Sequence, residues 1–96
     1  MKSLKPLEPG MMVKLRKIYS GYAAAVEAPD LTSSTHFFEL RFRGPGIFID
    51  STSTFTVVEE KSFSLEARSP TTSRFVRIIL PNGKACWIPR RNLTII

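Results

Sequence analysis

The C-terminal part of the chain constrains the fold most, because two apolar segments flank the sequence Pro81-Asn82-Gly83. Apolar segments on both sides of such a turn are typical of a β-hairpin. Proline suits the second position of a type I turn and glycine suits the left-handed position that closes it, so a three-residue loop fits better than a two-residue loop. We therefore expect residues 74–80 to pair with residues 84–89.

This register decides which side chains share a face of the hairpin. One face carries the residues that we expect in the core, namely Val76, Ile78, Cys86 and Ile88. The other face carries Phe75, Arg77 and Trp87, and is a candidate binding surface. A shift of one residue would exchange the two faces, so Trp87 as an ordinary core residue is the alternative.

Upstream, short apolar segments separated by turn signals predict further strands at 11–18, 36–43, 47–49, 55–58 and 63–65. In the first of these, Val13 and Leu15 would face inward. In the second, the alternation predicts that Phe38, Leu40 and Phe42 face inward.

The segments between these strands are expected to be loops. Residues 1–10 form an extended lead-in, and residues 32–35 and 69–73 are polar loops. For residues 22–28 we favour a loop with at most one helical turn, because seven residues are too few to form a stable helix unaided.

The chain has 96 residues, enough for one domain spanning residues 1–96, and its content of 43% hydrophobic and 23% charged residues is typical of a folded soluble protein. Cys86 is the only cysteine, which excludes an internal disulfide and favours a cytoplasmic location. No apolar run approaches the length of about 18 residues that a membrane helix needs. We expect no membrane association.

The positive charge is concentrated at one end of the sequence. Residues 1–60 carry seven basic and seven acidic side chains, whereas residues 61–96 carry seven basic ones against Glu66, which accounts for the whole net charge of +6. Such an asymmetry indicates a polyanionic partner. A cationic surface that only aids solubility is the alternative.

These observations predict a non-catalytic module that binds DNA or RNA through a basic, aromatic face. The expected binding residues are Arg74, Phe75, Arg77, Lys84, Trp87, Arg90 and Arg91. The cations would contact phosphates, while Phe75 or Trp87 would stack on bases. The alternative is an accessory factor that docks on a larger protein partner with an acidic surface.

Catalytic chemistry has little basis in this sequence. His36 is the only histidine, and a hydrolytic site with Cys86 and Asp50 would require one particular fold of the loops, with Cys86 turned away from the core. No metal-ligand spacing and no phosphate-binding glycine loop is present. We expect no enzyme activity, no metal, no cofactor and no small-molecule substrate.

The segment Ala85-Cys-Trp-Ile-Pro-Arg-Arg-Asn-Leu-Thr-Ile95 resembles the end of an SH3 domain, in which a hairpin leads through a single 3₁₀ turn into a short last strand. Pro9-Gly-Met-Met-Val-Lys-Leu15 is similar to the first strand of prokaryotic SH3-like and KOW-type barrels. The resemblance implies an all-β, small SH3-like barrel of about five to seven short antiparallel strands, with residues 17–35 as a long first loop. Asn92 stands where peptide-binding members have tyrosine, which disfavours recognition of proline-rich peptides.

Overall fold

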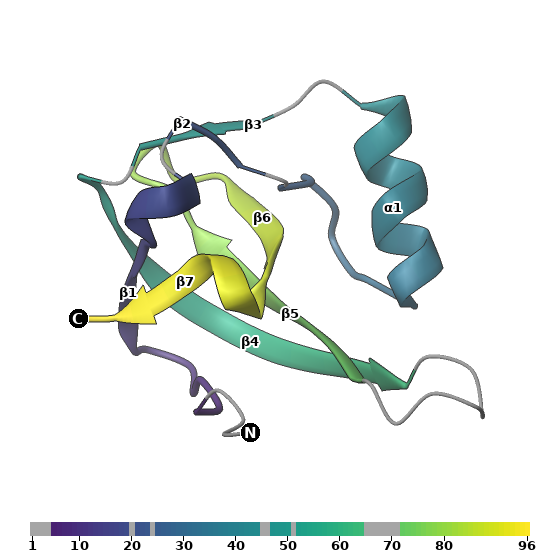
Figure 1. The fold of residues 1–96 in the computed structure, drawn as a ribbon, viewed down its shortest axis with the longest axis horizontal. Helices are drawn as coiled ribbons and strands as arrows, with labels where there is room; N and C mark the ends of the chain where they lie inside the picture. Colours follow the sequence, from purple (N-terminus) through teal and green to yellow (C-terminus); the bar gives the residue numbers. More distant parts are fainter. Residues whose placement is uncertain (1–4, 20, 24, 45–46, 51, 65–71) are drawn as a thin grey trace.

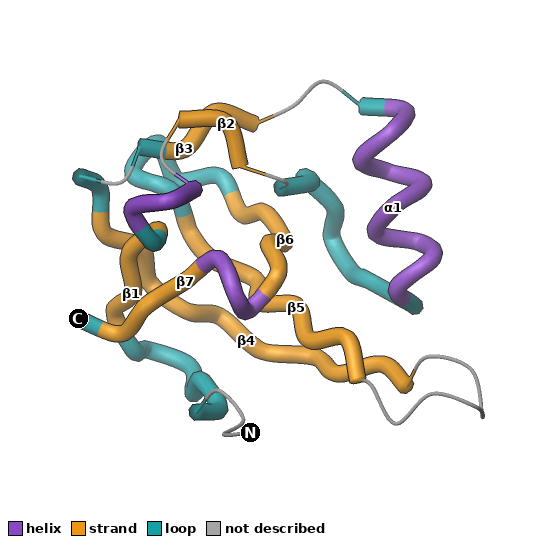
Figure 2. Tube along the Cα trace, in the orientation of Figure 1, coloured by secondary structure: helices purple, strands orange, loops and turns teal. Residues whose placement is uncertain are grey.

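Strands dominate the computed structural model, which describes residues 5–19, 21–23, 25–44, 47–50, 52–64 and 72–96 (Figure 1). The strands are β1 (Met12–Leu15), β2 (Gly21–Ala23), β3 (Ile47–Ile49), β4 (Thr54–Ser64), β5 (Thr72–Ile79), β6 (Ala85–Pro89) and β7 (Leu93–Ile95). The helical segments are α1 (Ser34–Arg43) and two 3₁₀ turns, η1 (Lys17–Tyr19) and η2 (Arg90–Asn92). The predicted mostly β character is confirmed (Figure 2).

Five of the strands form one antiparallel sheet in the order β6-β5-β4-β1-β7, and β2 pairs with β3 separately. The first strand lies between the longest strand and the last one, with Val13 opposite both Phe55 and Ile95. In the described part of the chain the edge strands β6 and β7 do not pair with each other. The sheet is therefore open there, and a closed barrel is not seen.

The C-terminal hairpin has the predicted register. Ile78 pairs with Cys86 and Arg77 pairs with Trp87. Leu80 N–H donates to the carbonyl oxygen of Lys84 at 2.8 Å, and Gly83 has a φ of +86°, the left-handed conformation that favours glycine. The turn thus places the side chains of β5 and β6 as the sequence indicates.

The inward faces of these strands form the main core. Val13 and Leu15 of β1 are buried against Ile78 and Cys86 of the hairpin, as predicted. Leu7 of the lead-in also reaches this core. Burial of these aliphatic side chains is the main stabilising contribution in a domain of this size.

The prediction of a strand at 36–43 is wrong, because these residues form α1. Ser33 caps the helix, since its Oγ accepts a hydrogen bond from the main-chain N–H of His36 at 3.0 Å. The alternating phenylalanines suggested a strand, but Phe37 and Leu40 supply an inward face at helical spacing. Phe38 and Phe42, which were expected to face inward, are exposed instead.

Several smaller expectations also need revision. The two short strands predicted on either side of Glu59 and Glu60 are one strand, β4, with an irregularity between Val57 and Glu59, and residue 65 lies outside the described part. Thr72 and Ser73, expected in a loop, begin β5, while residues 69–71 are outside the described part. The first loop contains η1 and β2, so the strand predicted at 11–18 ends at Leu15, and the polar loop predicted at 32–35 ends where α1 begins at Ser34.

The chain ends as the resemblance implies, with η2 directly after β6 and β7 directly after η2. Figure 1 shows β1 and β7 at one side of the molecule and α1 at the other. None of the helices in the described part is both long enough and apolar enough to span a bilayer.

Candidate functional site

The two aromatic residues expected to stack on a ligand are buried in a second core. Trp87 is 0% and Phe75 is 3% exposed. They lie on the predicted face of the hairpin, but that face is covered by residues 26–31 and by Phe37 of α1. The prediction of an exposed aromatic surface is therefore wrong for Phe75 and Trp87, although the register behind it is correct.

The segment that covers Trp87 is fixed by main-chain hydrogen bonds. Val26 and Trp87 exchange two N–H to carbonyl bonds, of 2.9 and 2.7 Å, so Val26 extends the sheet beyond β6. Lys61 Nζ lies 5.8 Å from the centre of the Trp87 ring and forms an ion pair with Asp30. This bond from Lys61, together with the N–H of Leu31, lowers the pKa of Asp30.

Arg90 also differs from the expectation, because it is only 4% exposed and has a structural role. Its Nε and Nη2 donate to the carbonyl oxygen of Lys5 at 3.1 and 2.8 Å, and its Nη1 donates to the carbonyl oxygen of Leu93 at 3.0 Å. Burial lowers the pKa of Arg90, and the nearby Glu60 carboxylate opposes this effect. A guanidinium held in this way does not offer its donors to a phosphate.

Glu60 holds a second arginine that was expected to bind nucleic acid. Its Oε2 accepts a hydrogen bond from Arg74 Nε at 3.0 Å and lies 2.9 Å from Arg74 Nη2. Its Oε1 accepts from the main-chain N–H of Leu7 at 3.1 Å. Arg74 and Arg90 thus both help to hold the lead-in on the sheet.

The remaining predicted cations do not form one surface with these residues. Lys84 and Arg91 are exposed, in the hairpin turn and in η2 respectively. Arg77 is half-buried, and its Nε has no hydrogen-bond partner among the described residues. Of the seven predicted binding residues, only Lys84 and Arg91 are exposed and therefore accessible to a ligand.

The fold creates a different group of cations that the sequence pattern did not predict. Arg16 N–H donates to the carbonyl oxygen of Asn92 at 2.8 Å, and its Nη1 donates to that of Arg91 at 3.4 Å. Lys14, Arg16, Lys17 and Arg91 are all exposed, and none of them forms an ion pair with a described residue. We call these four residues the basic patch.

The signal for this patch was present but incomplete. The alternation in 11–18 places Lys14 and Arg16 on the outward face of their strand. The charge count, however, assigned them to the neutral part of the sequence. Only the pairing of β1 with β7 brings them next to Arg91.

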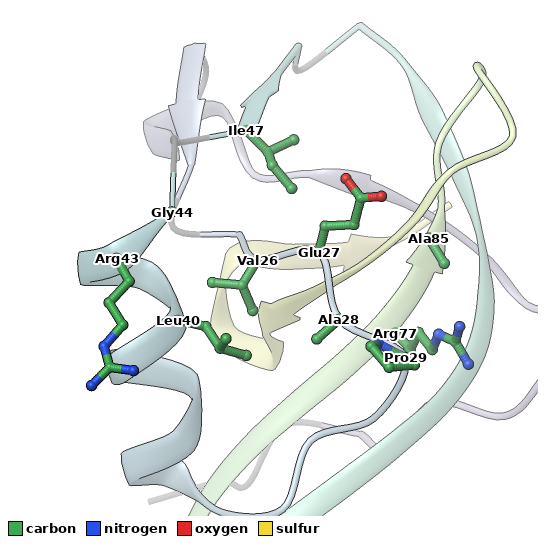
Figure 3. Close-up of a pocket in the computed structure, with 10 residues that line it drawn as sticks. All are labelled: Val26, Glu27, Ala28, Pro29, Leu40, Arg43, Gly44, Ile47, Arg77 and Ala85. Carbon is green, nitrogen blue, oxygen red and sulfur yellow. The ribbon is translucent and has the colours of Figure 1, made fainter.

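A pocket of about 680 Å³ lies between the C-terminal end of α1 and the hairpin (Figure 3). Val26, Leu40 and Ile47 give it apolar walls, and Glu27, Arg43 and Arg77 contribute charges. Figure 3 shows the guanidinium groups of Arg43 and Arg77 at opposite sides, directed away from each other. The two arginines are therefore not arranged to hold one small anion together.

The potentially reactive side chains do not meet. Cys86 is fully buried in the main core, and this burial raises the pKa of its thiol to about 12. His36 lies at the start of α1, where its Nδ1 accepts a hydrogen bond from Thr32 N–H at 3.2 Å. Among the described residues, no group of three or more His, Cys, Asp or Glu side chains is placed to hold a metal ion.

No protein-family model matches the chain, and comparisons with curated proteins and with solved structures also find no significant match.

Proposed function

We propose that the protein is a non-catalytic module that binds nucleic acid through the basic patch. The observation that carries the proposal is that the pairing of β1 with β7 places Arg16 beside Arg91, with Lys14 and Lys17 close to Arg16 in the chain. None of these four exposed cations has an acidic partner among the described residues. The backbone of a nucleic acid presents phosphates in series, and exposed cations of this kind bind them.

The overall charge supports the same proposal. The chain carries a net charge of +6, so its electrostatic field attracts a polyanion in addition to the direct contacts of the basic patch. Lys84, at the exposed hairpin turn, adds a further cation that is free to contact phosphate. In this proposal Arg74 and Arg90 hold the fold together, and the aromatic residues Phe75 and Trp87 make no ligand contact.

The proposal includes an SH3-like barrel located in the cytoplasm. The tight hairpin, η2 and β7 follow one another in the order that the resemblance implies, which supports the barrel. The single, buried cysteine is compatible with a reducing compartment. A structure determined by NMR, with long-range contacts closing the sheet, would test the barrel directly.

A salt titration tests nucleic-acid binding. Four phosphate contacts predict that log affinity for duplex DNA falls with log salt with a slope of about −3.6. Binding measured by fluorescence anisotropy at several salt concentrations gives this slope. A slope near zero, or no binding at low salt, would contradict the proposal.

A second candidate function is docking on a protein partner, which the pocket beside α1 favours. Its apolar walls suit an apolar side chain, while Arg43 and Arg77 among its lining residues suit a partner that carries an acidic group next to that side chain. A complex that survives nuclease treatment and about half-molar salt would support this function over the first, because salt of that strength screens exposed charges.

A further inference from the structure

The exposed face of α1 carries two phenylalanines that the core does not use. Phe42 is 83% exposed, more than any other large apolar side chain in the described residues, and Phe38 is 41% exposed. They are four residues apart, so they lie on the same face of the helix. Phe42 forgoes most of the favourable burial that phenylalanine normally gains, and Phe38 forgoes part of it, which points to a contact outside the chain.

These rings are presented on a supported helix. Phe38 packs against Phe37 in an edge-to-face geometry, with centroids 5.5 Å apart and planes at 86°. Phe37 is itself fully buried and lies 4.5 Å from the Phe75 ring. Phe42 follows four residues later, about 6 Å along the helix axis. The second core thus anchors an aromatic surface whose position is set before any ligand arrives.

The charges on α1 favour an anionic ligand. The two phenylalanines favour a ligand that also has flat, exposed rings. Arg41 and Arg43 are exposed and form no ion pair with a described residue, and Glu39 is the only acidic residue of the helix. Single-stranded nucleic acid offers unstacked bases and phosphates together. A duplex offers the phosphates but keeps the faces of its bases inside the stack.

We infer that α1 is a stacking surface for the unpaired bases of single-stranded nucleic acid, with Phe38 and Phe42 as the stacking residues and Arg41 as a phosphate contact. This inference rests on the proposed function and narrows its ligand to single strands. The strand β1, from which the basic patch extends, lies at the other side of the molecule from α1 (Figure 1). A strand of about 20 nucleotides reaches both sites, because even stacked bases rise about 3.4 Å each and the longest dimension of the protein is 38 Å.

The test compares fluorescein-labelled dT20 with a 20-base-pair duplex in an anisotropy titration at low salt. The wild-type protein should bind dT20 more tightly. Phe42→Ala should weaken dT20 binding about tenfold, within the range expected for one stacked base, and change duplex binding less than about twofold. Ile96→Ala removes another exposed apolar side chain, outside α1, and should change neither affinity.

A second variant reports the contact directly. Phe42→Trp should retain binding, and its exposed indole should be quenched when dT20 stacks on it, above the constant emission of buried Trp87. Unchanged dT20 affinity in Phe42→Ala, with a steep salt slope in the wild type, would overturn the stacking surface and leave the basic patch intact. Equal weakening of dT20 and duplex binding would overturn the assignment to single strands. Failure of the wild type to bind either probe would overturn the proposed function as well.

Discussion

The side chain of Arg90 binds the main chain of Lys5 across 85 positions of the sequence, through two hydrogen bonds of 3.1 and 2.8 Å to one carbonyl oxygen. The same guanidinium holds the carbonyl oxygen of Leu93, and Glu60 Oε1 lies 3.7 Å from its Nε. One buried cation therefore connects the lead-in, the longest strand and the last strand.

Replacing Arg90 should destabilise the fold. Arg90→Met removes three hydrogen bonds and leaves Glu60 with less charge compensation, so we expect a loss of about 3 kcal/mol in the free energy of unfolding. Urea denaturation measures this loss. The matched control is Arg91→Met, because Arg91 is exposed and should cost less than about 0.5 kcal/mol. Similar midpoints for the two variants would show that Arg90 has no structural role.

The burial of Trp87 in the second core leads to a prediction about its fluorescence. Native Trp87 should emit at short wavelength and resist quenching by acrylamide, because its ring is fully buried. Phe37→Ala opens a cavity beside Phe75 and should cost about 3 to 5 kcal/mol while increasing acrylamide quenching. Phe42→Ala, on the exposed side of the same helix, should change neither quantity. An exposed, readily quenched Trp87 in the wild type would show that α1 does not cover the hairpin.

The raised pKa of the Cys86 thiol leads us to expect a loss of stability at alkaline pH. Its pKa is about 12 in the folded protein against a reference of 9.0, so the folded state keeps a proton that the unfolded state releases. The free energy of unfolding should therefore be unaffected by this group below pH 9 and fall between pH 9 and 12, approaching a slope of about 1.4 kcal/mol per pH unit. Denaturation of the wild type and of Cys86→Ala over this range isolates the contribution of the thiol. Identical pH profiles for the two proteins would contradict the prediction.

Neutralising the basic patch should change the salt dependence of binding. Arg16→Gln combined with Arg91→Gln removes two phosphate contacts, so the slope of log affinity against log salt should decrease in magnitude by about 1.8. Arg41→Gln combined with Arg43→Gln removes the same charge from α1 and should leave the slope for duplex DNA nearly unchanged. Equal effects of the two double variants would show that the protein acts through net charge alone.

The C-terminal hairpin could be predicted from the sequence because its information is local. Pro81, Asn82 and Gly83 define the turn, and the turn sets the register of Ile78 with Cys86. The same local information did not say what lies on the outer face. Trp87 is buried by Val26 and Phe37, which are distant in sequence, and their approach depends on the tertiary fold.

The segment around α1 was predicted wrongly for a different reason. Phe38, Leu40 and Phe42 alternate with charged residues, which is typical of a strand, whereas the Ser33 cap and the Phe37 to Leu40 spacing are typical of a helix. The helix places the ring of Phe37 against the ring of Phe75, so tertiary packing favours the helix over the strand. Similarly, the basic patch depends on the pairing of β1 with β7, which no local pattern reveals.

The pairing of β1 with β7 has a consequence for how this chain is made. While the protein emerges from the ribosome, β1 can find β4 in the middle of the chain, but one of its edges stays unpaired until Leu93, Thr94 and Ile95 are released. During that interval the exposed edge can pair with another growing chain. Lys14 and Arg16, on and next to that strand, are exposed cations, and charged side chains of this kind disfavour pairing at an open edge.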